Sequence, residues 1–219
     1  MPIATRHRDD PISQLTPLPS LAVRREVDAK VMAVLQGKPE AAMTRRFDAG
    51  HRAYVALWAG EPAAWGWVAT RSAEIGELSS TFAIPSGERY LWNFVTSKEH
   101  RGKGIYPRLL DAIVRAESRE AARFWIAYAP ENHALGSGIR KAGFATMAEL
   151  SFDGAGRPAL RETIPGGGRA AARVFGLAEA TEPLASCWRC ARAATTAVPS
   201  CGTGVCACDY QRPEIGCAA

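Results

Sequence analysis

One segment constrains the fold more than any other: an apolar run that enters a glycine-bearing turn and continues into an amphipathic helix pattern. Residues 90–96 are apolar and rich in aromatic and β-branched side chains, which is typical of a buried strand. The turn that follows carries Gly102 and Gly104, and apolar residues then recur at helical spacing over 105–114. A strand that passes directly into a helix in this way predicts a fold that mixes both element types.

Patterns on either side of this segment complete the expected fold. Helical spacing is found over 24–36, 40–48 and 132–141, and strand-like runs over 53–59, 65–70, 76–84, 124–128, 144–152, 160–163 and 173–176. The turn at residues 60–62 indicates an antiparallel hairpin. This order predicts the α/β (α+β) class, with a mixed, mostly antiparallel twisted sheet that is flanked by helices.

The cysteines divide the chain into parts. All six lie between Cys187 and Cys217, and the first 186 residues contain none. The first 20 residues hold four prolines and no periodic pattern, so we interpret 1–20 as a loose lead-in. We therefore predict one domain over 21–178 and a small cysteine-rich segment over 179–219.

Composition excludes several classes of protein. Hydrophobic residues make up 47% of the chain, which is enough to form a core and excludes disorder throughout. The net charge is +5, but no block of Lys and Arg indicates nucleic-acid binding. No apolar run reaches the roughly 20 residues that span a bilayer, and no signal-peptide core is found. We expect a cytoplasmic protein with reduced thiols and with neither a nucleic-acid nor a membrane partner.

The cysteine-rich segment has the spacing of a metal site. Cys187 and Cys190 form a C-x2-C pair, a common half-site for zinc, and Cys201, Cys206 and Cys208 can complete a four-thiolate site. Few large apolar residues lie there, so this segment needs a metal, disulfides or docking onto the body. We predict zinc, and an iron–sulfur cluster, disulfides or an enzymatically modified peptide are the alternatives.

The turn after residues 90–96 has the features of an anion site. Gly102 and Gly104 let backbone N–H groups converge without a Cβ. The first N–H groups of the helix that follows lack internal partners, and Arg101 and Lys103 add positive charge. A phosphate or pyrophosphate is the natural ligand, and a tight turn with solvated basic residues is the alternative. The pattern is neither a P-loop nor a Rossmann fingerprint.

A second segment follows the strand predicted over 124–128. Asn132 can cap the helix expected over 132–141, which is its structural interpretation. Gly143 is placed to end that helix before Phe144 begins the next strand.

Together, in this order, the two segments resemble the GNAT superfamily of N-acetyltransferases over about residues 20–176. The family's acetyl-CoA signature is Q/R-x-x-G-x-G/A, and its later motif is roughly N-x-x-S-x-x-x-Y-x-K-x-G-F. The residues that match are Arg101 and Gly104 in the first motif, and Asn132, Lys141, Gly143 and Phe144 in the second. The residues that depart are Tyr106 for Gly or Ala, Leu135 for Ser, and Ile139 for Tyr.

The resemblance implies that two splayed parallel strands, 91–96 and 124–128, hold acetyl-CoA between them. The implied contacts are Phe94, Val95 and Thr96 for the pantetheine arm, Arg101, Gly102, Lys103, Gly104, Ile105 and Tyr106 for the pyrophosphate, and Asn132 for the pantetheine or the acetyl end. Lys103 and Arg108 are also expected near the phosphates. The backbone N–H of Val95 is expected to polarise the thioester carbonyl.

The resemblance also implies N-acetyltransferase activity, in which a small-molecule or peptide amine attacks the thioester directly. Homodimers are frequent in the family. Because Ile139 stands where members often have a Tyr that acts as general acid, Tyr106 and Ser137 are predicted as substitutes. Glu77 and Glu88 are the predicted candidates for a base that faces the acceptor, and a solvated surface carboxylate is the alternative interpretation of each.

A non-catalytic function is the alternative. In it, a GNAT-like module binds CoA or a peptide and serves as sensor or scaffold for a metal-binding cysteine segment. The replacement of the Tyr by Ile139 favours this alternative. An open acceptor cleft beside the splayed strands would favour the enzyme, and a blocked cleft would favour the module.

Overall fold

The computed structural model describes residues 1–11, 13–78, 80–153 and 157–180, without the side chain of Glu77. Its strands are β1 (Pro2–His7), β2 (Leu21–Glu26), β3 (Arg52–Trp58), β4 (Glu61–Ala69), β5 (Ser72–Ile75), β6 (Ser80–Ala83), β7 (Glu88–Thr96), β8 (Arg123–Ala127), β9 (Ala145–Phe152), β10 (Pro158–Glu162) and β11 (Ala178–Glu179). Its helices are α1 (Ala29–Gln36), α2 (Glu40–Asp48), α3 (Ile105–Glu117), α4 (His133–Lys141) and α5 (Gly167–Phe175), with 3-10 turns η1 (Gly76–Leu78) and η2 (Lys98–His100).

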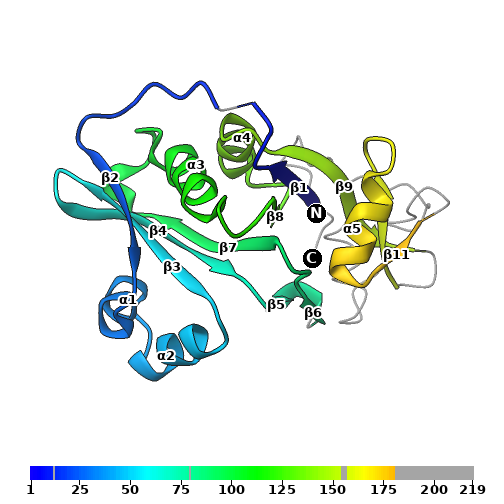
Figure 1. The fold of residues 1–219 in the computed structure, drawn as a ribbon, viewed down its shortest axis with the longest axis horizontal. Coiled ribbons are helices and arrows are strands. Elements are labelled where there is room, and N and C mark those ends of the chain that lie inside the picture. The colour runs from blue at the N-terminus through cyan, green and yellow to red at the C-terminus, as the bar shows by residue number, and fades with distance from the viewer. Residues whose placement is uncertain (12, 79, 154–156, 181–219) are drawn as a thin grey trace, which may run out of the picture.

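One mixed sheet organises these elements. Its strand order is β11-β10-β9-β1-β8-β7-β4-β3-β2, while β5 and β6 pair separately as a hairpin. Among the described strands, only β7–β8 and β10–β11 pair in parallel. Helices α3 and α4 cover one face, and α1, α2, α5 and the hairpin lie on the other (Figure 1). This confirms the predicted class, a mixed and mostly antiparallel sheet flanked by helices.

Helix α3 is anchored by the apolar face that the sequence predicts. Ile105, Leu109 and Ile113 are at most 1% exposed and pack with Leu91 and Phe124 of the sheet. Each such side chain contributes roughly 1.5–3 kcal/mol when it is fully buried. The start of this helix, which carries the glycine turn, is therefore held firmly against the end of β7.

In the described part of the chain, no helix is long and apolar enough to cross a bilayer.

The interpretation of residues 1–20 as a loose lead-in is wrong for their first part. Strand β1 lies inside the sheet and pairs antiparallel with both β8 and β9. Ile3 and Ala4 are fully buried and join the clusters on opposite faces. Pro2 is tolerated because it is the first residue of the strand. A strand this short, which begins with a proline and is followed by polar residues, has no periodic signal of its own.

The segment predicted as one helix over 24–36 divides into two elements. Leu21–Glu26 forms the edge strand β2, which pairs with β3. Helix α1 begins only after Asp28, whose carboxylate accepts hydrogen bonds from the N–H groups of Lys30 and Val31. This N-cap fixes the helix start and prevents the helix from extending back into β2.

Two further predictions of strands are wrong. The run over 76–84 is not one strand, because residues 72–83 form β5, η1 and β6. The strand expected over 173–176 is the last turn of α5, in which Ala171, Val174 and Phe175 are buried at helical spacing. The alanine-rich stretch before residue 173 favours this helix, and the strand prediction overlooked that propensity.

A buried ionic network joins the end of α3 to the sheet. Glu117 is 1% exposed and accepts hydrogen bonds from Tyr54, Arg52 and Arg89. Both arginines also reach Glu120, which is largely exposed. Burial raises the pKa of Glu117, but the hydrogen bonds from its three partners outweigh this and hold the pKa below its ordinary value.

Candidate functional site

The parallel pair β7–β8 separates partway along its length. The two strands are in register from Glu88, opposite Arg123, to Leu91, opposite Ile126. Beyond Leu91, β7 continues to Thr96 with β4 as its only sheet partner. The last residues of β7 therefore expose unpaired backbone groups on the side that faces β8.

A bulge sets the geometry of this free edge. The register between β4 and β7 shifts between Trp65 and Trp67, so two residues of β7 face Gly66. Asn93 has φ +53° there, a left-handed conformation that Asn adopts more easily than most residues. A Cβ on Gly66 would overlap with the ring of Phe94, so the glycine makes room for that ring.

The ladder with β4 determines which N–H groups point to the free edge. The N–H of Ser97 donates to the carbonyl of Ala63 at 2.9 Å. Opposed pairs in an antiparallel ladder alternate between hydrogen-bonded and non-bonded, so Val95, two residues earlier, directs its N–H at β4. Consecutive N–H groups of an extended strand point to opposite edges, so we infer that those of Phe94 and Thr96 point to the free edge. The sequence pattern had predicted the N–H of Val95 for that edge.

The glycine turn supplies a second set of free donors. Gly102 and Gly104 have φ +76° and +70°, which a residue with a Cβ adopts only with strain. The N–H groups of residues 102–104 donate no hydrogen bond to any described residue. The N–H groups of Ile105 and Tyr106 belong to the first turn of α3 and have no partner within the helix. Arg101 lies beside them and donates to the carbonyl of Thr96 at 3.3 Å.

These two features border a cavity of about 460 Å³, which we call the loop cavity. Its lining residues are Phe94, Val95, Thr96, His100, Arg101, Gly102, Gly104, Ile105, Tyr106, Asn132, Ala134 and Leu135. The structure thus brings together nearly all of the residues predicted to contact a cofactor. Lys103 is the exception, since its ammonium lies 5.5 Å from the ring centre of Trp58.

Two predicted residues have structural tasks of their own. Arg108 donates to the carbonyls of Thr16 and Gly104, so its guanidinium fastens residue 16 to the glycine turn. Asn132 is the N-cap of α4, and its side chain accepts from the N–H of Leu135 at 3.0 Å. Asn132 still lines the loop cavity. Ile139 is fully buried in the core, so this position contributes no polar group.

A second cavity of about 590 Å³ adjoins the first, and we call it the hairpin cavity because β5 and β6 border it. Its lining residues are Met1, His51, Ser72, Ala73, Glu74, Ile75, Gly76, Thr81, Tyr90, Trp92, Asn93, Ala127, Tyr128, Ala129 and Leu135. The two cavities share Leu135, and consecutive residues of β7 line them in turn. The bulge at Asn93 therefore lies between the glycine turn and a mostly uncharged cavity.

His51 is held in one protonation state by its neighbours. The indole N–H of Trp92 donates to Nδ1 of His51 at 3.1 Å, so the neutral ring carries its proton on Nε2. Burial lowers the pKa of His51, and the charge of Arg46 lowers it further. Arg46 itself lies over the rings of Trp92 and Trp67, at 4.6 and 5.1 Å from their centres.

The predicted catalytic residues have different outcomes. Tyr106 lines the loop cavity, and its buried hydroxyl has no hydrogen-bond partner among the described residues. Burial raises the pKa of Tyr106, and Tyr128 raises it further. Ser137 is half-buried on α4 and lines neither cavity. The side chain of Glu77 lies outside the described residues. Glu88 is buried and bonded to Trp125 and Arg173, so it does not face the acceptor.

The hairpin cavity contains three residues that the sequence analysis did not select. Glu74 and His51 come from separate elements, and no motif connects them. Tyr128 directly follows the short apolar strand β8. Its place after a strand of the splayed pair is the one signal in the sequence that could indicate a role.

The predicted metal ligands cannot be assessed in this way. Cys187, Cys190, Cys201, Cys206 and Cys208 all lie outside the described residues, so the zinc site stays a prediction. Within the described ranges, no group of three or more His, Cys, Asp or Glu residues could hold a metal ion.

The sequence model described as the acetyltransferase (GNAT) family matches residues 23–144, more than half of the chain. No curated protein matches. Among solved structures, the chain is similar to a GCN5-related N-acetyltransferase from Kribbella flavida, with 16% identity and a TM-score of 0.44 over 66% of this chain and 53% of that one. It spans only about half of that protein.

Two other solved structures have similar scores. A GNAT-family acetyltransferase from Colwellia psychrerythraea has 15% identity and a TM-score of 0.45, over 66% of this chain and 52% of that one. The aminoglycoside acetyltransferase HMB0005, from an uncultured soil metagenomic sample, has 18% identity and a TM-score of 0.44, over 61% and 97%. The family rests on the sequence match, because these identities and TM-scores are low.

Proposed function

Since the chain belongs to the acetyltransferase (GNAT) family, we propose that it transfers an acetyl group from acetyl-CoA to the nitrogen of an amine. The observation that carries this proposal is the pair of adjoining cavities on the free edge of β7. One cavity is bordered by unpaired N–H groups and Arg101, and the other is open for an acceptor. A non-catalytic module would need no second cavity in this place.

The residues of the loop cavity fit the anionic thioester substrate. The N–H groups of residues 102–106 converge on a turn in which both glycines have positive φ. They are suited to a pyrophosphate, and the free edge of β7 is suited to an extended amide arm. When bound, acetyl-CoA supplies the acyl group and the thiolate leaving group.

In our proposal, two residues of β7 and the tyrosine that follows β8 have distinct tasks. The N–H of Phe94 on the free edge donates to the carbonyl oxygen as negative charge develops on it. Asn93 and Tyr128 line the cavity from which the amine approaches. The amine attacks the carbonyl carbon and loses a proton to solvent as the C–S bond breaks. Tyr128 gives its hydroxyl proton to the departing sulfur, and solvent restores that proton.

Tyr128→Phe is expected to lower the rate of acetyl transfer about 100-fold and to leave the affinity for acetyl-CoA unchanged. General acids contribute this much when their proton is needed only in the transition state. Stopped-flow or steady-state thiol release gives kcat, and calorimetry gives Kd.

Tyr106→Phe is the matched control for this variant. Burial raises the pKa of Tyr106, which makes its phenol a poor proton donor. We expect its kcat to stay within about three-fold of wild type. A large loss in Tyr106→Phe together with an unchanged Tyr128→Phe would transfer the role to Tyr106.

Gly66→Ala is expected to weaken acetyl-CoA binding about ten-fold. The added Cβ would overlap with Phe94, whose ring lines the loop cavity and packs edge-on against Tyr106 at 5.6 Å. Overpacking of this kind typically costs about 1–3 kcal/mol. Gly76→Ala is the control, because a Cβ on Gly76 meets nothing within 4 Å. Equal calorimetric Kd values for the two variants would contradict the expectation.

The test of the proposed function is calorimetric titration with acetyl-CoA and with CoA, followed by thiol-release assays on a panel of primary amines. We expect micromolar binding and amine-dependent release of CoA. A folded protein that binds neither nucleotide would overturn the proposal.

A further inference from the structure

We infer that the acceptor is a small dicationic amine: a molecule with a second ammonium or guanidinium group beyond the amine that is acetylated, and without a carboxylate. This inference rests on the proposed function and specifies the substrate class of the same site. It is argued from the distribution of charge around the two cavities.

The hairpin cavity has one fully charged side chain, and it is acidic. Glu74 is the only acid among its described lining residues, which include no Lys or Arg side chain. Met1 is also a lining residue, and its ammonium, the one positive group of these residues, donates to the carbonyl of Leu150 at 2.6 Å. The chain as a whole carries a net charge of +5, so a cavity without basic side chains differs from its surroundings. No side chain of this lining therefore repels a cationic ligand.

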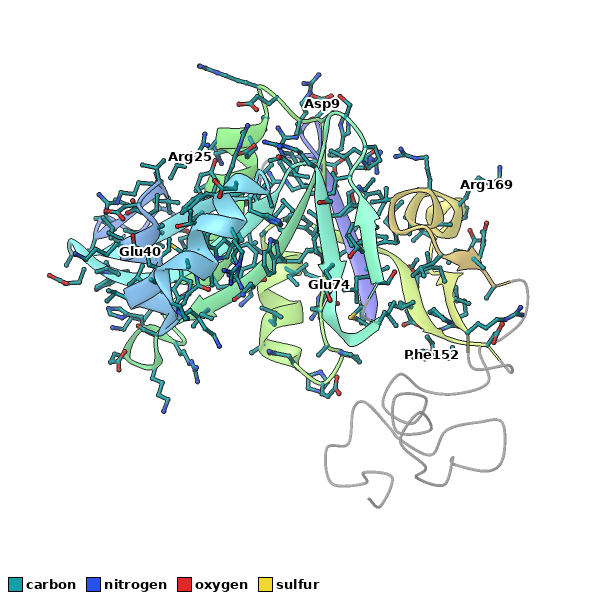
Figure 2. The ribbon with its side chains drawn as sticks, turned by 90° about the horizontal axis from the view of Figure 1, so that it is seen from below. Asp9, Arg25, Glu40, Glu74, Phe152 and Arg169 are labelled. Atoms are coloured by element: carbon teal, nitrogen blue, oxygen red, sulfur yellow. The ribbon has the colours of Figure 1, made fainter. Side chains whose placement is uncertain are left out.

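The carboxylate of Glu74 is available to a ligand. Glu74 lies on β5 (Figure 2), is exposed and lines the cavity, and no described residue forms an ion pair or hydrogen bond with its carboxylate. The buried acids Glu88, Asp111 and Glu117 differ, because each is paired with arginine. An unpaired carboxylate beside a cavity attracts a positive group more than any neutral residue of that wall does.

His51 does not offset this charge. Its Nδ1 is occupied by the indole N–H of Trp92, and burial lowers its pKa. At neutral pH the ring is therefore uncharged and presents Nε2–H as a hydrogen-bond donor. The guanidinium of Arg46 is held over Trp92 and Trp67 and bonded to Gln36, and Arg46 does not line the cavity.

The loop cavity has the opposite character. Its described lining residues include Arg101 and His100 and no Asp or Glu. Each cavity therefore favours one sign of charge, the loop cavity an anion and the hairpin cavity a cation. The carboxylate of an acceptor would be attracted to the loop cavity and repelled by Glu74 in the hairpin cavity.

Three primary amines test this inference: 1,5-diaminopentane, 1-aminopentane and 6-aminohexanoate. In each, a five-carbon chain follows the amine nitrogen, and only the group at its far end differs. We expect wild-type kcat/KM to be about ten-fold higher for the diamine than for the monoamine, and lowest for the amino acid. In Glu74→Gln, the value for the diamine should fall about ten-fold, while the value for the monoamine stays within about two-fold. Glu61→Gln, at an exposed position outside both cavities, is the control for a general change in charge.

Direct binding keeps the inference separate from the proposed function. Calorimetry of the diamine and the amino acid, with and without CoA, should give tighter binding of the diamine, and Glu74→Gln should remove the difference. Equal values for the three amines, a preference for 6-aminohexanoate, or an unaltered preference in Glu74→Gln would overturn the inference. If no amine is acetylated, the proposed function fails, and the binding result alone decides the charge preference.

Discussion

Gly104→Glu is expected to reduce the affinity for acetyl-CoA at least about 100-fold. Gly104 has φ +70°, and a Cβ there would lie 2.6 Å from the guanidinium of Arg108. The substitution therefore strains the turn and displaces the residue that fastens it. It also places a carboxylate where the free N–H groups of the turn are suited to a phosphate, so the electrostatic attraction becomes repulsion. Calorimetric titration of the folded variant measures the loss.

Gly37→Glu separates the local effect from general strain. Gly37 ends α1 with φ +58°, and a Cβ on it meets nothing within 4 Å. It has the same left-handed backbone and receives the same new charge, far from the loop cavity. We expect a modest loss of stability and wild-type affinity. If Gly104→Glu binds as well as Gly37→Glu does, the turn is not the binding site.

Glu117→Gln is expected to lower the free energy of unfolding by about 3–5 kcal/mol. The substitution leaves the buried guanidinium of Arg89 and the largely buried one of Arg52 without the carboxylate that they share. Removing one partner from such a network is costly because the remaining charge stays buried. Denaturation by urea, monitored by fluorescence, measures the change.

Glu120→Gln is the matched control for this prediction. Glu120 contacts the same two arginines, but 56% of its side chain is exposed. Water screens such a pair, and its loss should cost no more than about 1 kcal/mol. Similar losses in the two variants would show that burial does not govern this network.

The contribution of Glu117 should depend on pH. Its pKa is lower in the folded chain than its ordinary value of about 4.5, so the unfolded chain takes up this proton first as the pH falls. The stabilisation is therefore complete above the ordinary pKa and is lost as the pH falls through the folded value. The difference in unfolding free energy between wild type and Glu117→Gln should shrink between pH 7 and pH 3.

The elements with a strong local pattern could be predicted from the sequence. The two glycines lie only a few residues before the apolar face of α3 in the sequence. They therefore stay next to it in the structure. Helix α2 has the predicted bounds of 40–48. Strand β7, the glycine turn and the first turns of α3 and α4 form the loop cavity, which explains why most of its lining residues were found.

The hairpin cavity could not be predicted in the same way. His51 lies shortly after the end of α2, Glu74 lies on β5 and Tyr128 follows β8. Only the folded chain brings these three residues together. The bulge at Asn93 was equally hidden, because it depends on the register between β4 and β7. The contact between Arg108 and Thr16 was hidden as well, because Thr16 lies in a segment with no pattern.

The position of β1 determines the order in which the sheet can be completed. Its partners β8 and β9 lie more than 100 residues away along the chain, whereas β2, β3 and β4 are joined by nearby ladders. Closing so long a loop is slow compared with local pairing, and synthesis proceeds from the N-terminal side. Strand β1 must therefore wait, unpaired, for partners made much later. Strand β1 pairs with β8, which is one of the two splayed strands. The strand that supports this side of the splayed pair is thus among the last parts of the sheet to be fixed.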